Sequence, residues 1–136
     1  MIKVLKLKPD HWQTMNQHVA SQAPLEACGL LVGTEDAVEA VLKTRNAEQS
    51  PVRFRIDPQE QYNAIKWMEA HNLDLLGIFH SHPSGPETVS PTDIAEAAYE
   101  VVHVVWSRSN QIWSARGFWI ENGQVTEVTL QVMAEE

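Results

Sequence analysis

The residues best suited to chemistry are two histidines that close an apolar run, in the segment His80-Ser81-His82. Side chains two positions apart in a strand point to the same face, so both imidazoles can approach one point in space. Such a pair can chelate a metal, although this spacing alone is a weak signal. A catalytic zinc usually takes three nitrogen or oxygen ligands from the protein and keeps a fourth position for water. The pair therefore needs a third ligand.

Asp93 is the candidate for that third ligand. It lies eleven residues beyond His82, and the loop between them contains glycine and proline, which can turn the chain back toward the histidines. The segment Ser90-Pro91-Thr92-Asp93 also has the order of an ordinary helix start, with serine at the N-cap, proline at N1 and an acid at N3. Helix capping and metal binding are compatible at these residues.

Hydrolysis at a metal also needs a general base that takes a proton from the attacking water. Glu26 is the candidate, because it is a charged residue that leads into an otherwise apolar stretch at residues 27–33. Taken alone, Glu26 has a second interpretation, as the solvated first residue of a strand.

Together these residues resemble the signature of the JAMM/MPN+ (JAB domain) zinc metalloprotease family. Glu26 is followed by His80-Ser81-His82, then by seven residues, Ser90, two residues and Asp93. The resemblance includes the flanking residues 24–31 and 77–79 and covers about residues 2–132. The short 83–89 loop has no room for the insertions with which some relatives grip a second ubiquitin, so the chain is most similar to the minimal stand-alone prokaryotic form.

The resemblance implies an MPN/JAMM (cytidine-deaminase-like) fold and a zinc-dependent hydrolase of peptide or isopeptide bonds. Its expected partners are ubiquitin-like or sulfur-carrier proteins with a C-terminal Gly-Gly tail, since glycine lets a backbone approach the metal closely. One Zn²⁺ per chain would be held by His80, His82 and Asp93. Glu26 would activate the zinc water and pass its proton to the leaving amine, while Ser90 would donate a hydrogen bond to the oxyanion.

Other functions fit the sequence less well. A non-catalytic MPN-type scaffold remains the main alternative, because relatives that lost zinc ligands serve only as assembly partners, whereas all five site residues are present here. A zinc nucleobase deaminase needs a Pro-Cys-x-x-Cys ligand pair, and the chain has one cysteine. A zincin needs His-Glu-x-x-His, which does not occur in the sequence. Four further histidines are expected to be structural or surface residues: His11, His18, His71 and His103.

Apolar spacing and turn residues predict a mixed order of helices and strands. Pro58 at a helix start and the hairpin dipeptide Asn122-Gly123 are the strongest local signals. Trp106 and Trp113 are expected either to pack in the core or to line a groove for an extended tail. Helices are predicted near residues 10–22, 58–71 and 91–100, and strands near 2–7, 26–34, 37–44, 53–56, 75–80, 101–106, 112–121 and 125–133.

Composition sets the remaining expectations. The chain of 136 residues is expected to form a single domain over 1–136, of the α/β class, with a mixed β-sheet and flanking helices. A net charge of −8 argues against nucleic acid as a partner. No run is apolar enough to span a membrane and no secretory signal is evident, so a cytoplasmic location is expected. Cys28, the single cysteine, is expected to be a small buried residue.

Overall fold

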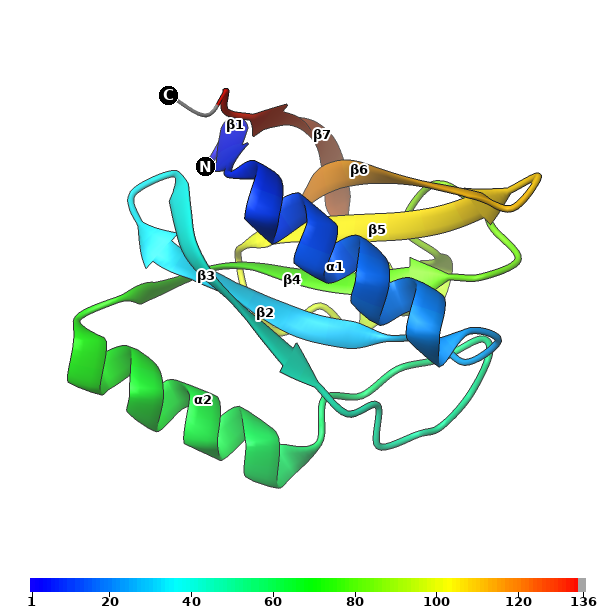
Figure 1. The fold of residues 1–136 in the computed structure, drawn as a ribbon, viewed down its shortest axis with the longest axis horizontal. Helices are drawn as coiled ribbons and strands as arrows, with labels where there is room; N and C mark the ends of the chain where they lie inside the picture. The colour runs from blue at the N-terminus through cyan, green and yellow to red at the C-terminus, as the bar shows by residue number, and fades with distance from the viewer. Residues whose placement is uncertain (135–136) are drawn as a thin grey trace.

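The structure is a computed structural model that describes residues 1–134 (Figure 1). Its strands are β1 (Val4–Leu7), β2 (Cys28–Thr34), β3 (Ala37–Thr44), β4 (Asp74–His82), β5 (Val102–Ser109), β6 (Ile112–Glu121) and β7 (Gln124–Val132). Its helices are α1 (Pro9–Gln22), α2 (Pro58–His71) and α3 (Pro91–Ala95).

The strands form one mixed sheet that closes into a barrel in the order β1-β3-β2-β4-β5-β6-β7. β4 is antiparallel to β2 and parallel to β5, which places it at the centre of the sheet. The short β1 closes the barrel by pairing in parallel with β7 over four residues and with β3 through Lys6 and Ala37. The predicted α/β class with a mixed sheet and flanking helices is confirmed, while the closure of the sheet was not foreseen.

The two long helices cover different parts of the sheet, as Figure 1 shows, with α1 lying across the strands and α2 below β2 and β3. Met15 and Val19 of α1 pack into the main core cluster with Phe79 and Trp106. Ala64 and Met68 of α2 pack into a second cluster around β2 and β4. Core clusters that include residues of α1 and of α2 thus pack on β4.

Local signals explain where most elements begin and end. The Asp57 carboxylate caps α2 by accepting hydrogen bonds from the backbone N–H groups of Gln59 and Glu60. Asn122 and Gly123 have φ of 52° and 76°, which is the backbone that a tight hairpin between β6 and β7 requires. Helix α2 matches its predicted bounds, and the 122–123 hairpin is confirmed.

Two predicted elements were wrong. The third helix ends at Ala95 instead of near residue 100, and none of its residues is buried, so little packing favours a longer helix. The segment 53–56 is not a strand, because within the described residues only Ile56 forms a bridge, to Asn46. The Asn46 side chain instead bonds the backbone groups of Arg53 and Arg55, which a neighbouring strand would otherwise pair.

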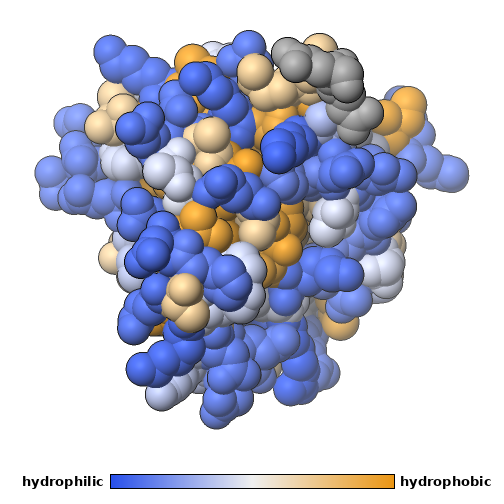
Figure 2. All heavy atoms as spheres, turned by 60° about the vertical axis from the view of Figure 1, so that its left-hand side comes forward, coloured by the Kyte–Doolittle hydropathy of each residue, from blue (hydrophilic) through white to orange (hydrophobic). Residues whose placement is uncertain are grey.

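The core contains the residues expected there. Cys28 and Trp106 are fully buried, so Trp106 packs in the core and does not line a groove. Figure 2 shows one face covered largely by hydrophilic side chains, with hydrophobic ones gathered in a central patch. No helix among residues 1–134 is both long enough and apolar enough to cross a membrane.

Candidate metal centre

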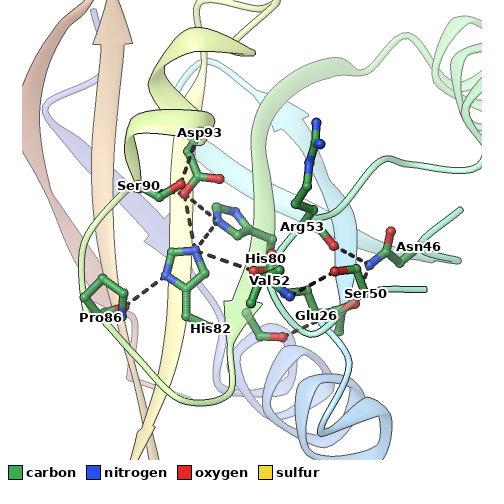
Figure 3. Close-up of polar contacts among 12 residues, drawn as sticks. Glu26, Asn46, Ser50, Val52, Arg53, His80, His82, Pro86, Ser90 and Asp93 are labelled. Carbon is green, nitrogen blue, oxygen red and sulfur yellow. Dashed lines mark hydrogen bonds and ion pairs between the residues drawn. The ribbon is translucent and has the colours of Figure 1, made fainter. Parts of the chain in front are cut away.

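The end of β4 presents two imidazoles to one point. His80 is fully buried and His82 is 5% exposed. Both side chains lie on the same side of the strand, because they are two residues apart, and their Nε2 atoms are 3.2 Å apart (Figure 3). The structure therefore brings together the histidines that the sequence singled out.

Asp93 reaches the same point from the first turn of α3. Its Oδ2 lies 3.1 Å from His80 Nε2 and 3.3 Å from His82 Nε2. Ser90 fixes this carboxylate, since its backbone N–H donates to Asp93 Oδ2 over 2.8 Å. In return, the Ser90 hydroxyl accepts a hydrogen bond from the Asp93 N–H over 3.0 Å. This reciprocal capping aims the carboxylate at the histidines.

The three ligand atoms have the spacing that a tetrahedral metal requires. They are separated by 3.1, 3.2 and 3.3 Å. For zinc–ligand bonds of about 2.0–2.1 Å, the edge of a tetrahedron is about 3.3 Å. The donor set of two imidazoles and a carboxylate is also one that zinc accepts. The residues present therefore fit a zinc ion.

A hydrogen bond outside the cluster sets the tautomer of His82. Its Nδ1 donates to the carbonyl of Pro86 over 2.9 Å, which leaves the lone pair of neutral Nε2 directed at the cluster. Without a metal, a protonated His82 can donate from Nε2 to the Asp93 carboxylate over 3.3 Å, and a cation between the two groups would take the place of that proton. The ring of Phe54 stacks on His80 at a centroid distance of 4.4 Å and orients it.

Glu26 lies beside these residues, immediately before β2. Its Oε2 is 4.0 Å from His82 Nε2, farther than the Asp93 carboxylate. Glu26, His80 and His82 also form a group whose ligand atoms all lie within 4.8 Å. Asp93 is the better candidate for a third ligand because its spacings match tetrahedral edges, whereas Glu26 stands far enough away to leave room for a water between it and a bound metal. The Glu26 side chain is buried and its Oε1 has no hydrogen-bond partner.

The pKa values of the Glu26 and Asp93 carboxyl groups are shifted in opposite directions. Burial raises the pKa of Glu26 to about 7. Burial also disfavours ionisation of Asp93, but hydrogen bonds from His80 and His82 outweigh it and hold the pKa of Asp93 well below its usual range. Burial lowers the pKa of His80. One carboxylate is thus suited to holding a cation and the other to exchanging a proton.

Three residues near Glu26 were not found from the sequence. The hydroxyl of Ser81 accepts a hydrogen bond from the Ala27 N–H over 2.8 Å, and the Asn46 side chain donates to the Glu26 carbonyl over 3.0 Å. The Ser50 carbonyl accepts from the Glu26 N–H over 2.8 Å. A serine on the buried face of a strand needs a partner, which was a usable signal for Ser81. Asn46 and Ser50 offered none, because their contacts join distant segments.

Comparison with known proteins relates the chain to one family. The model of the prokaryotic homologs of the JAB domain matches residues 8–121. The chain is 38% identical to the probable TtuB-protein conjugate cleaving protease of Thermus thermophilus, over 85% of this chain and 74% of that protein. It is 34% identical to the desampylase of Pyrococcus furiosus, over 91% and 88%. It is 32% identical to the CysO-cysteine peptidase of Mycobacterium tuberculosis, over 98% and 94%.

Solved structures of other proteins have the same fold. A protein from Desulfitobacterium hafniense superposes with a TM-score of 0.87 at 33% identity, over 96% of this chain and 94% of that one. A JAB1/MPN domain protein from Archaeoglobus fulgidus superposes with a TM-score of 0.59 at 17% identity, over 93% and 97%, which supports the fold alone.

Proposed function

Because the chain belongs to the family of prokaryotic homologs of the JAB domain, we propose that it is a zinc-dependent peptidase or isopeptidase. Its proposed substrates are ubiquitin-like or sulfur-carrier proteins joined to another group through a C-terminal Gly-Gly tail. Three relatives support this class, since they are named for cleaving TtuB–protein conjugates, for desampylation and for acting on CysO-cysteine.

One observation carries the proposal at the level of the site. The Nε2 atoms of His80 and His82 and the Oδ2 of Asp93 lie 3.1 to 3.3 Å apart, as three ligands of one tetrahedral zinc would. When bound, zinc would polarise the substrate carbonyl and lower the pKa of its water toward about 7. The remaining tasks belong to side chains of this chain.

Glu26 acts as the proton shuttle in this proposal. Its carboxylate lies on the His82 side of the cluster, where it can take a proton from the attacking water and pass it to the leaving amine. Burial raises its pKa to about 7. A carboxylate with a pKa near the working pH can both accept and return a proton efficiently.

Ser90 acts as the donor to the oxyanion. Its oxygen already accepts the Asp93 N–H over 3.0 Å, so its own proton remains available to the substrate. A donor fixed in advance stabilises charge that develops in the transition state, and one such hydrogen bond is worth about 3 to 4 kcal/mol. The capping interaction keeps Ser90 in place at no cost in reorganisation.

The proposed function is tested by measuring zinc content and cleavage on the same protein samples. A diglycine-tailed carrier fused to a short peptide is incubated with the zinc-loaded protein and with a His80→Ala, His82→Ala double variant, and folding of both is checked by circular dichroism. We expect about one zinc per wild-type chain and cleavage after the second glycine, with both lost in the variant. A folded wild-type protein that binds no zinc and cleaves nothing would instead support the scaffold function.

A further inference from the structure

A cavity of about 340 Å³ lies beside the metal cluster and shares Asp93 with it. One wall comes from the segment before α2 and the other from the segment after α3. An ion pair between Arg53 and Glu96, 2.7 Å long, joins the two walls. The lining of the cavity includes Phe54, Ile56, Ile78, Asp93, Ala97 and His103.

Among these side chains, only His103 has a fully buried polar atom that lacks a hydrogen-bond partner. It is 4% exposed, and its Nε2 has no hydrogen-bond partner. Burial, followed by the charge of His80, lowers the pKa of His103 to about 4, so the ring is neutral near pH 7. The neighbouring Tyr99 carbonyl favours the tautomer with the proton on Nδ1, which leaves the unpartnered Nε2 as an acceptor. Buried polar atoms are usually hydrogen-bonded, so a donor on a ligand in this cavity would satisfy His103 Nε2.

The pairing of β4 with β5 shows how far His103 lies from the metal cluster along the strands. Ile78 pairs with His103, and His80 pairs with Val105, so His103 lies two residues back from the level of His80. Two residues of extended chain span about 6.6 Å. A substrate that places its last glycine at the metal therefore places the residue before Gly-Gly above Ile78 and His103.

The position of Glu26 gives the direction of the tail. Its carboxylate lies beside His82 and is not among the residues that line the cavity. Because Glu26 passes its proton to the leaving amine, that amine lies on the His82 side of the cluster. The carrier tail must then leave toward the cavity, past Asp93 and Phe54.

We infer that this cavity is the subsite for the residue preceding the diglycine, and that His103 Nε2 selects a side chain with a hydroxyl donor on an apolar stem, such as threonine or tyrosine. This inference rests on the proposed function. Phe54, Ile78 and Ala97 supply apolar contacts for the stem. Charge alone does not favour a cationic side chain, because Arg53 and Arg55 line the cavity together with Glu48 and Glu96.

The experiment uses four diglycine-tailed carrier fusions that differ only in the residue before Gly-Gly. They form two pairs, threonine with valine and tyrosine with phenylalanine, in which the members differ mainly by the hydroxyl. We expect kcat/KM of the wild-type protein to favour the hydroxyl member of at least one pair by about tenfold or more, because a site built to bond a hydroxyl rejects its apolar analogue.

The variant His103→Leu should reduce that ratio to near one while retaining cleavage of the apolar members, and His71→Leu, at an exposed position on α2, should keep it. Equal rates within both pairs for the wild-type protein, or a full ratio in folded His103→Leu, would overturn the inference. The wild-type ratios do not depend on the folding of any variant. Cleavage of none of the four fusions by zinc-loaded protein would overturn the proposed function and the inference with it.

Discussion

Ser81 and Ala27 join the two segments that carry the site. The Ser81 hydroxyl, between the two histidines of β4, accepts a hydrogen bond from the backbone N–H of Ala27 over 2.8 Å. Ser81 is fully buried and Ala27 follows Glu26 directly, so this contact sets the position of Glu26 relative to His82. Ser81, between the two proposed metal ligands, is therefore a positioning residue.

Ser81→Ala should leave zinc content near the wild-type level but lower kcat, because the Ala27 N–H loses its partner and Glu26 is less well held. An unpaired buried N–H costs about 1 to 3 kcal/mol, which unfolding in urea can measure. Ser114→Ala, at an exposed position on β6, is the matched control and should change neither quantity. Wild-type kcat and stability in Ser81→Ala would contradict this role.

Glu26→Gln should keep the fold and the zinc but remove most hydrolysis, since an amide cannot accept the proton of water. Rates are compared at equal zinc occupancy, determined by metal analysis. Near-native turnover by this variant would rule out Glu26 as the base.

The pKa of Glu26 also predicts how the stability of the metal-free protein depends on pH. Burial raises the pKa of Glu26 in the folded protein to about 7 from its ordinary value of 4.5, so folding disfavours the charged form. Its contribution to stability is therefore complete below pH 4.5 and declines as the pH rises to about 7. In chelator, the free energy of unfolding of the wild type relative to Glu26→Gln should fall across this window by about 3 kcal/mol at most. A pH-independent difference would show that Glu26 has an ordinary pKa.

Ser90→Ala should lower kcat and stability together, because Ser90 both caps α3 and, in the proposed mechanism, donates to the oxyanion. Loss of the cap costs about 1 kcal/mol, and loss of the donor lowers kcat by about a hundredfold or more. Measuring kcat well below the melting temperature separates the two effects. A stability loss without any change in kcat would leave Ser90 with only its capping role.

Asn46→Ala should loosen the segment that lies against the site. The Asn46 amide donates to the carbonyls of Glu26 and Arg53, and its oxygen accepts from the N–H groups of Glu48 and Arg55. We expect a loss of about 2 to 4 kcal/mol in unfolding free energy, since several buried backbone groups lose partners.

Faster hydrogen exchange in residues 47–55 is the direct readout for Asn46→Ala. Asn63→Ala, at an exposed position on α2, should be close to neutral and serves as the control. Wild-type exchange in this segment would contradict a central role for Asn46.

The sequence predicted the parts of the fold that depend on local signals. Proline at N1 marked the start of α2, and the alternation of His80 and His82 along a strand predicted their common face. The spacing of Asp93 from these histidines carried the family resemblance. These features need only the residues close to them in the chain.

Features that depend on contacts between distant segments could not be predicted in this way. The Asn46 side chain takes hydrogen bonds that a strand at 53–56 would have used, so that segment has the composition of a strand without being one. Only the register of β4 with β5 places His103 beside Ile78. Closure of the barrel likewise depends on β1 meeting β7 from opposite ends of the chain.

The most direct test of the whole account is a mass measurement on a diglycine-tailed carrier conjugate incubated with the zinc-loaded protein. We expect a new carrier species ending at the second glycine, which disappears when a chelator removes the metal and returns when zinc is added back. An intact conjugate in the presence of bound zinc, or the same cleavage by a folded variant carrying both His80→Ala and His82→Ala, would contradict it.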